Sequence, residues 1–336
     1  MTTHTPAASP PARDVEQSGA TTGHDAQHDV VRDVRFYLQQ TPRQLPSRFL
    51  YDALGSALFD AICHLPWYRI TRAELQLLER HARTIGEAVG ARGRLVELGC
   101  GSGEKLAALL THAGVPGVHA HLVDLSAAAL ARSVQTLAML EGQALRVTTH
   151  QATYEGGLLA LPADDAHPTL IAFLGSNIGN FDAPGAAALL RQVRGALRPG
   201  DSLLLGADLV KPERDLLLAY DDPLGLTAAF DKNLLLRLNR ELDADFALDR
   251  FAHRAIWRPD ASRVEMHLVS LAAQEVRVPK ADLRFTLEEG DTIWTESSYK
   301  FEAQGVRQLV EPAGFAQREQ WIDEEARFAL TLFAAV

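Results

Sequence analysis

The sequence predicts an α/β fold in which helices cover both faces of a parallel sheet. Two observations support this prediction. Apolar segments typical of buried strands alternate with amphipathic segments typical of helices, as in consecutive βαβ units. The first of these strands, residues 94–98, ends in the glycine-rich turn Gly99-Cys100-Gly101-Ser102-Gly103, and a helical pattern follows directly. A strand, a tight turn and a helix N-terminus form the first ligand-binding corner of a doubly wound sheet.

The chain leads into this pattern through a polar segment and then helices. Residues 1–28 are rich in Thr, Pro, Ala, Gly and His and lack hydrophobic periodicity, so we expect a disordered leader. From Val30 to Leu65 apolar residues recur at intervals of three and four, which predicts helix. Thr71 and Glu74 have the spacing of a capping box, which would open a helix that ends near Val89.

The alternating segments occupy the middle of the chain. Strands are predicted near residues 94–98, 118–124, 145–150, 168–174 and 202–208. Helices are predicted near residues 104–113, 126–139 and 184–197.

The pattern changes after Leu209. Residues 211–243 are predicted to be helical with a break at the turn 221–225, and residues 253–301 alternate in the manner of strands. Strands that follow βαβ units suggest an additional α+β subdomain. A helix near residues 303–313 and the apolar run 328–336 would then return the chain to the main sheet.

The composition argues against several classes of protein. The formal net charge of −10 disfavours nucleic-acid binding, and no apolar stretch approaches the ~20 residues of a membrane span. Cys63 and Cys100 are the two cysteines and provide no disulfide framework, so we expect reduced thiols in a cytoplasmic protein. No Cys or His spacing indicates a metal site.

The glycine-rich turn favours a cofactor without phosphates. A dinucleotide-binding turn has a third glycine where this chain has Glu104. A carboxylate at a helix N-terminus would repel a pyrophosphate, which disfavours a nicotinamide-dependent oxidoreductase. S-adenosylmethionine, which is cationic at sulfur, fits better. An ordinary strand-to-helix turn remains the alternative for this motif.

Other polar residues follow predicted strands. Asp124 closes the second strand, where a carboxylate can accept hydrogen bonds from both ribose hydroxyls of an adenosine, although a helix cap would also explain it. Asn180 lies in the glycine-flanked loop after the fourth strand and could bind a carboxylate or an amine, or only satisfy a turn. Glu296 and Ser298 share one strand face and could bind an imidazole, or form a solvated face.

Nine segments together resemble the histidine Nα-methyltransferases of ergothioneine biosynthesis. The resemblance runs from about Val31 to the C-terminus. The segments, in chain order, are FLYDALGSALFD, LPWYRITRAE, VELGCGSGEK, FLGSNIGNF, DSLLLGADLVK, AYDDPLGLTAAF, NRELDADF, VEMHLVS and TESSYKF.

This resemblance implies a fold, a cofactor and a domain arrangement. The fold would be a Rossmann-like class I S-adenosylmethionine-dependent methyltransferase with an additional α+β substrate-binding domain. Residues 72–209 and 300–336 would form the methyltransferase domain, and residues 29–71 and 210–299 the substrate-binding domain. The expected partner is the small molecule L-histidine, with no nucleic acid, membrane or metal, and the expected state is a monomer.

The resemblance also implies roles for individual residues. Tyr51 and Asn180 are the expected catalytic residues. The expected substrate-binding residues are Tyr51, Phe59, Tyr68, Gly175, Asn180, Tyr220, Thr227, Met266, Glu296 and Ser298. The expected cofactor-binding residues are Gly99, Gly101, Lys105, Asp124, Thr153 and Tyr154.

One position departs from the family pattern. The family often has Asp-Phe at the adenine edge, where this chain has Thr153-Tyr154. The aromatic ring is retained, but a carboxylate acceptor for the adenine amine is lost. The resemblance implies Nα-trimethylation of histidine to hercynine, the first step of ergothioneine biosynthesis. A methyltransferase for another amino acid such as tryptophan, or a non-catalytic adenosine-binding regulator, are the alternatives.

Overall fold

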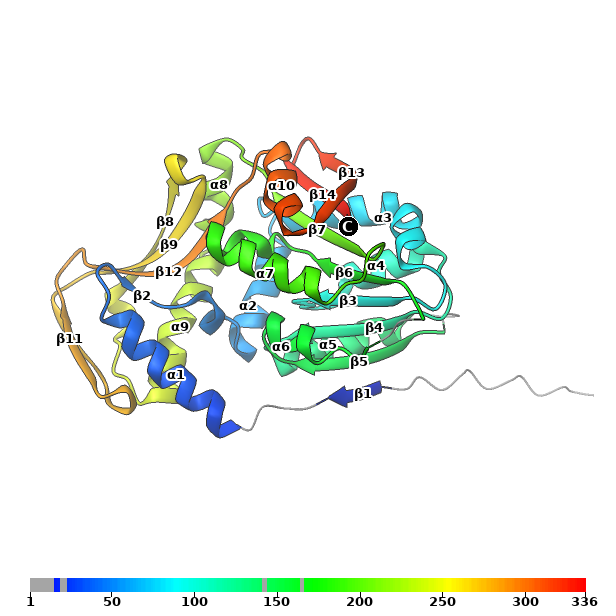
Figure 1. Cartoon of the computed structure of the whole chain (residues 1–336). Coiled ribbons are helices and arrows are strands. Elements are labelled where there is room, and N and C mark those ends of the chain that lie inside the picture. The colour runs from blue at the N-terminus through cyan, green and yellow to red at the C-terminus, as the bar shows by residue number, and fades with distance from the viewer. Residues whose placement is uncertain (1–14, 19–22, 141–143, 164–165) are drawn as a thin grey trace, which may run out of the picture.

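A computed structural model describes residues 15–18, 23–140, 144–163 and 166–336. Its largest feature is an eight-stranded sheet with the strand order β1-β5-β4-β3-β6-β7-β14-β13 (Figure 1). Neighbouring strands are parallel from β1 to β7, whereas β14 is antiparallel to both β7 and β13. The strands are β1 (Val15–Ser18), β3 (Arg94–Leu98), β4 (His119–Asp124), β5 (Arg146–Gln151), β6 (Thr169–Phe173), β7 (Ser202–Asp208), β13 (Phe315–Asp323) and β14 (Phe328–Ala335).

Helices cover both faces of this sheet, and each face has its own apolar core. Leu95 of β3 packs into the core shared with α3, α4 and α5, whereas its neighbour Val96 packs into the core shared with α6, α7 and α10. Successive strand residues point to opposite faces, so the alternation confirms a doubly wound sheet. The helices are α3 (Ile70–Val89), α4 (Glu104–Ala113), α5 (Ala127–Ala138), α6 (Tyr154–Leu159), α7 (Ala183–Gly195) and α10 (Ala303–Val310).

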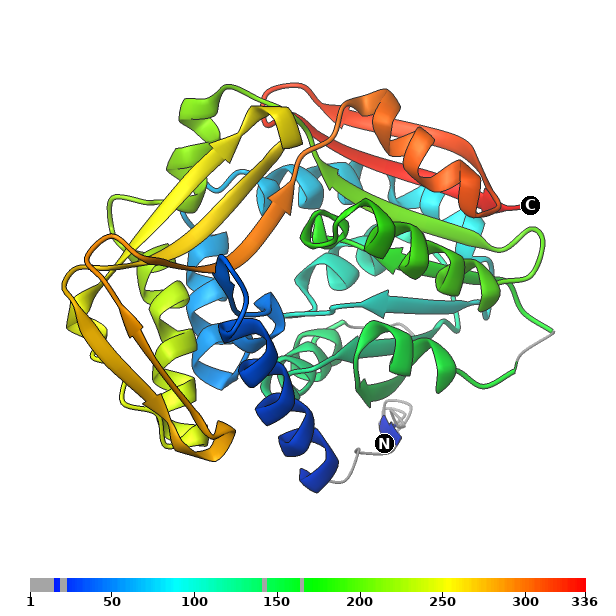
Figure 2. The same ribbon diagram turned by 60° about the vertical axis from the view of Figure 1, so that its left-hand side comes forward.

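A second α+β part lies beside the carboxyl ends of the parallel strands (Figure 2). It contains a four-stranded sheet with the order β2-β12-β9-β8 and a separate hairpin of β10 and β11. Its strands are β2 (Arg43–Gln44), β8 (Phe251–Arg258), β9 (Arg263–Ser270), β10 (Gln274–Val278), β11 (Leu283–Leu287) and β12 (Thr292–Tyr299). Its helices are α1 (Gly23–Leu38), α2 (Ala53–Cys63), α8 (Glu213–Tyr220) and α9 (Leu226–Leu242).

Among the described residues, the two parts meet at a short backbone bridge beyond the ends of β7 and β12. A parallel bridge between Leu209 and Phe301 connects the chain after β7 to the chain after β12. Short 3₁₀ helices complete the connections. They are η1 (Ser47–Leu50), η2 (Asn177–Asn180), η3 (Leu248–Arg250), η4 (Pro259–Ala261), η5 (Pro279–Ala281) and η6 (Glu311–Ala313).

The predicted α/β fold with an added α+β part is confirmed, and each predicted central strand and helix has a counterpart within two residues. The continuous helical prediction for residues 30–65 is wrong, because β2 and η1 separate α1 from α2. The β-strand Phe315–Asp323 has no counterpart among the predictions. Residues 15–18 and 23–28 of the expected leader lie in β1 and α1, while its other residues lie outside the described ranges.

The predicted capping box is also wrong. Helix α3 begins at Ile70, so Thr71 lies inside its first turn, and the N-cap Arg69 makes no side-chain cap bond. Glu74 is instead fully buried. Its carboxylate accepts hydrogen bonds from the amide of Gly175, which is 101 positions away along the chain.

Candidate functional site

A cleft of about 700 Å³ opens at the carboxyl ends of the central parallel strands. It lies where open α/β sheets commonly bind ligands. All six residues that we expect to bind the cofactor line it. They are Gly99, Gly101, Lys105, Asp124, Thr153 and Tyr154.

The glycine-rich turn forms one wall of this cleft. Gly99 and Gly101 have φ angles of 76° and 53°, which favour glycine. A Cβ at Gly99 would lie 2.9 Å from Asn177 Nδ2, whereas a Cβ at Gly101 would meet nothing within 4 Å. The turn therefore leaves its backbone open beside the cleft and leads into α4, whose first residue Glu104 also lines it.

Asp124 holds the neighbouring turn in place. Its Oδ2 accepts a hydrogen bond from the Gly101 amide at 3.2 Å, and its Oδ1 accepts one from the Ser126 amide at 2.9 Å. Ser126, not Asp124, is the N-cap of α5. Burial raises the pKa of the Asp124 carboxyl, although hydrogen bonds from these amides oppose this effect.

Thr153 and Tyr154 form the far edge of the cleft. The Thr153 hydroxyl accepts a hydrogen bond from the Gly156 amide and so caps α6. The Tyr154 ring packs edge-on against Phe173 with a centroid distance of 5.1 Å, and burial raises the pKa of its hydroxyl. Tyr154 is thus a fixed, neutral aromatic side chain at this edge.

A second, smaller chamber adjoins the cleft. All ten residues that we expect to bind the substrate line it. They are Tyr51, Phe59, Tyr68, Gly175, Asn180, Tyr220, Thr227, Met266, Glu296 and Ser298. Tyr51, Phe59, Tyr68, Gly175 and Asn180 also line the larger cleft, so the two cavities share a wall and adjoin there.

Strands of the small sheet supply a polar wall of the chamber. Glu296 and Ser298 are two residues apart on β12, and Met266 of β9 pairs with Glu296 across the sheet. Burial, together with the nearby charge of Asp231, raises the pKa of Glu296 to about 8. The Thr227 hydroxyl oxygen is buried in the chamber wall.

Aromatic side chains form the opposite wall. Tyr51 packs edge-on against Phe59 and Phe230, with centroid distances of 5.7 and 5.5 Å. Tyr68 packs in the same way against Tyr220 at 6.4 Å. Burial raises the pKa of the Tyr51 hydroxyl well above its ordinary value, so Tyr51 is neutral at physiological pH.

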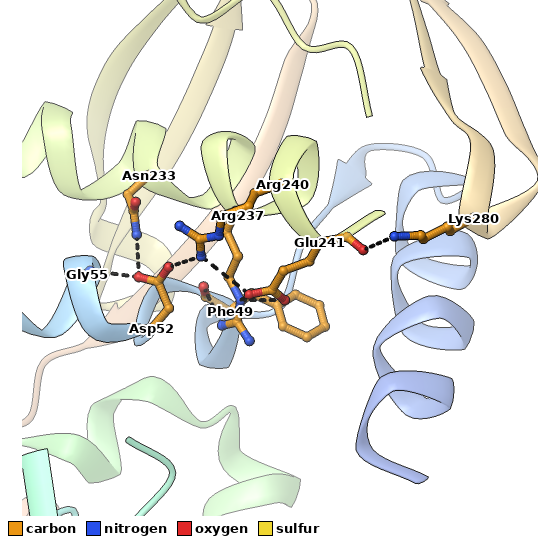
Figure 3. Close-up of polar contacts among 8 residues, drawn as sticks. All are labelled: Phe49, Asp52, Gly55, Asn233, Arg237, Arg240, Glu241 and Lys280. Carbon is orange, nitrogen blue, oxygen red and sulfur yellow. Dashed lines mark hydrogen bonds and ion pairs between the residues drawn. The ribbon is translucent and has the colours of Figure 1, made fainter. Parts of the chain in front are cut away.

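A polar network fixes the backbone beside Tyr51 (Figure 3). Asp52 accepts hydrogen bonds from the Gly55 amide, from Asn233 of α9 and from Arg240 of α9, at 2.7, 2.8 and 2.7 Å. These contacts cap α2 and attach it to α9. They therefore place Tyr51, the residue before Asp52, against the chamber.

Glu74 and Lys300, which contact lining residues of the site, were not among the expected site residues. Glu74 contacts Lys105 and Gly175 from a helix that we expected only to be capped there. Lys300 is fully buried behind Tyr220 and Ser298. Its signal was present in the sequence, because Lys300 follows Glu296 and Ser298 at the same spacing of two, one residue beyond the end of β12.

None of the helices in the described ranges has the length and apolar character needed to cross a membrane. Within the same ranges, no group of three or more His, Cys, Asp or Glu side chains is arranged to hold a metal ion. Cys63 and Cys100 are free thiols.

Comparisons with known proteins agree with this geometry. A family model described as "Histidine-specific methyltransferase, SAM-dependent" matches residues 30–335. A protein named histidine N-alpha-methyltransferase from Mycobacterium tuberculosis (strain CDC 1551 / Oshkosh) is 40% identical over 315 residues, which cover 93% of this chain and 97% of that protein. Ergothioneine biosynthesis protein 1 from Schizosaccharomyces pombe (strain 972 / ATCC 24843) is 30% identical over 302 residues, which cover 86% of this chain and 39% of that protein.

Solved structures give more distant matches. Magnesium protoporphyrin IX methyltransferase (ChlM) from Synechocystis PCC 6803, solved with bound SAH, has a TM-score of 0.46 and is 12% identical. The match covers 86% of this chain and 98% of that one.

Proposed function

The chain belongs to the family of histidine-specific, S-adenosylmethionine-dependent methyltransferases, and we propose that it methylates the α-nitrogen of L-histidine three times. The product would be hercynine, and the reaction would begin ergothioneine biosynthesis. The observation that carries this proposal is the convergence of ten expected substrate residues on one chamber that adjoins a glycine-lined cleft.

The cleft residues suit an adenosine cofactor with a positive charge in place of phosphates. The open backbone at Gly101 leaves room for the cofactor, and the Asp124 carboxylate would accept hydrogen bonds from the ribose hydroxyls. Tyr154 would flank the adenine. Glu104 at the N-terminus of α4 would oppose a phosphate and tolerate a sulfonium. S-adenosylmethionine, when bound, supplies an electrophilic methyl group.

The chamber residues suit histidine. Asn180, Tyr68 and Tyr220 would bind the α-carboxylate through an amide and two hydroxyls. Glu296 and Ser298 would bind the two ring nitrogens. Gly175, Thr227 and Met266 would complete the walls. An indole would require more room, and its single ring nitrogen could contact only one of Glu296 and Ser298.

The reactive amine must be neutral, because an ammonium has no lone pair. Tyr51 and Phe59 would lie beside the amine, and the buried aromatic wall disfavours the charged form. The neutral Tyr51 hydroxyl can pass the amine proton to solvent through the adjoining cleft. The rest of the catalytic effect would come from alignment by Asn180 and the ring contacts, since methyl transfer requires an in-line approach.

The same proposal assigns cofactor binding and substrate binding to different parts of the chain. Residues 72–209 and 300–336 would carry the cofactor, and residues 29–71 and 210–299 would carry the substrate. We also expect an active monomer. The free thiols of Cys63 and Cys100 agree with a cytoplasmic location.

Mass spectrometry tests the proposal directly. The protein would be incubated with S-adenosylmethionine and, separately, with histidine or tryptophan. We expect histidine to gain three methyl groups on the α-nitrogen. Methylation of the imidazole ring, or turnover of tryptophan without turnover of histidine, would show that the proposed function is wrong. Ligand-dependent thermal shifts with S-adenosylmethionine but no turnover of any amino acid would indicate a non-catalytic regulator.

A further inference from the structure

Lys300 lies directly behind the substrate chamber. Its side chain has no exposed surface, and it follows Glu296 and Ser298 on the same face of the chain. Its Nζ donates hydrogen bonds to Tyr220 Oη at 2.7 Å and to Ser298 Oγ at 2.9 Å. The third close oxygen is Asp208 Oδ2, at 3.0 Å.

This arrangement uses all three hydrogens of the ammonium group. A lysine ammonium has three donors and no acceptor, and Asp208, Tyr220 and Ser298 supply three oxygens. Burial alone would lower the pKa of Lys300, but the charge of Asp208 outweighs it and holds the pKa above its ordinary value. Lys300 is therefore a fixed donor to the hydroxyl groups of Tyr220 and Ser298 in the chamber wall.

The same contacts limit what the two hydroxyls can offer to a ligand. Tyr220 Oη and Ser298 Oγ lie 2.8 Å apart, so one of them donates to the other. The two groups have two hydroxyl hydrogens in total, and one of these forms the hydrogen bond between them. One hydrogen remains to point into the chamber, from either Tyr220 or Ser298.

We propose that Lys300 is a positioning residue that makes Tyr220 the donor and Ser298 an acceptor toward the bound amino acid. This inference rests on the proposed function, in which Tyr220 binds the α-carboxylate. A carboxylate only accepts hydrogen bonds, so it takes the one free hydrogen from Tyr220. Ser298 then donates to Tyr220 and keeps a lone pair for the substrate ring. The chamber is therefore specific for a ring that presents an N–H to Ser298.

The first experiment tests whether Ser298 accepts or donates the hydrogen bond to the substrate ring. Histidine would be compared with β-(4-thiazolyl)-L-alanine, whose ring has an acceptor nitrogen and no N–H. In Ser298→Ala we expect kcat/KM for histidine to fall at least about tenfold, while the value for the thiazole changes less than about threefold. Ser297→Ala, on the next position of β12, is the matched control and should change neither value. An equal or larger loss for the thiazole would show that Ser298 is a donor and would overturn the proposal.

The second experiment tests whether Lys300 fixes the direction of this hydrogen bond. In Lys300→Met the two hydroxyls can separate, so Ser298 can turn its hydrogen toward the ring. We expect the preference for histidine over the thiazole to narrow about tenfold, beyond any loss shared by both substrates. In a Ser298→Ala background the same change should not alter the preference further. An unchanged preference in Lys300→Met would overturn the role of Lys300.

We expect Lys300→Met to fold, because Lys211 also contacts Asp208, at 2.5 Å, and would still pair with this carboxylate. If it nevertheless melts below the assay temperature, the Ser298→Ala comparison alone still decides whether Ser298 accepts or donates. Failure of the proposed function would be distinct, because the wild-type protein would then not methylate histidine at all.

Discussion

Glu74 Oε2 lies 2.7 Å from Lys105 Nζ, and both Glu74 oxygens also accept hydrogen bonds from the Gly175 amide, at 2.8 and 2.9 Å. Glu74 is fully buried, whereas Lys105 lines the cofactor cleft. The pair therefore links α3 and α4 to the loop after β6, which leads to Asn180. A buried carboxylate thus supports the wall shared by the cleft and the chamber.

Removing Lys105 should destabilise the fold more than removing an exposed partner. In Lys105→Met the Glu74 carboxylate keeps the Gly175 amide but loses its counter-ion, which should cost about 3 kcal/mol of unfolding free energy. Lys280→Met breaks an exposed pair with Asp243 and should cost less than about 1 kcal/mol. Urea unfolding measures both. Equal losses in the two variants would contradict a structural role for the Glu74 pair.

Glu74 also shows where sequence reasoning reaches its limit. The spacing of Thr71 and Glu74 matches a local motif, but the true partner of Glu74 is Gly175, far away in the sequence. By contrast, continuous apolar runs predicted the central strands, because burial on both sheet faces acts on every strand residue. Glu296 and Ser298 were found for a similar reason, since two residues on one strand share a face. Lys300 continues that face, but its burial depends on Asp208 of another strand.

Asp124 should contribute to cofactor affinity. Charge-assisted hydrogen bonds to the ribose would be worth about 1.5–3 kcal/mol, so Asp124→Ala should weaken binding of S-adenosylmethionine about ten- to a hundredfold. Calorimetry measures this affinity. Asp124→Asn is a useful companion, because an amide oxygen can still accept the bond from Gly101 or Ser126. If Asp124→Ala binds the cofactor as tightly as the wild type, Asp124 only stabilises the backbone through its bonds with Gly101 and Ser126.

The Asp52 network should affect turnover through Tyr51. Asp52→Ala removes the cap of α2 and its contacts with Asn233 and Arg240, at a cost of about 1–2 kcal/mol. Because Tyr51 precedes this cap, kcat for histidine should also fall. Asp323→Ala removes a comparable bond to the Ala326 amide in another turn, and should reduce stability without changing kcat. Assays well below both melting temperatures separate the two effects, and equal kcat values would contradict the link to Tyr51.

The raised pKa of Glu296 should make the ligand-free protein less stable at alkaline pH. Its pKa is about 8 in the folded state and 4.5 as the reference value, so the folded state binds the extra proton between these values. Stability therefore decreases as pH rises through this window and levels off above it. Glu296→Gln mimics the protonated group, so its stability should not decrease through this pH window. Its stability relative to wild type should rise by about 3–5 kcal/mol from about pH 4 to about pH 9.

Differential scanning calorimetry at several pH values tests this expectation. Burial also raises the pKa of Glu97 to about 8, but Glu97 is present in both proteins and cancels from the difference. If the difference in unfolding free energy between Glu296→Gln and wild type does not depend on pH, the pKa of Glu296 is not raised in the folded state.

Glu296 and Asn180 should have separable effects on substrate choice. Without Glu296, an imidazole N–H has no partner in a buried chamber, which should cost about 1–3 kcal/mol for histidine. Asn180 lies on η2 in the wall shared by both cavities, and would bind the carboxylate that every amino acid carries. The ratio of kcat/KM values for histidine and tryptophan should therefore fall in Glu296→Ala, whereas Asn180→Ala should lower both values alike. If Glu296→Ala lowers both substrates equally, Glu296 is structural, and recognition of histidine would lose its main physical support.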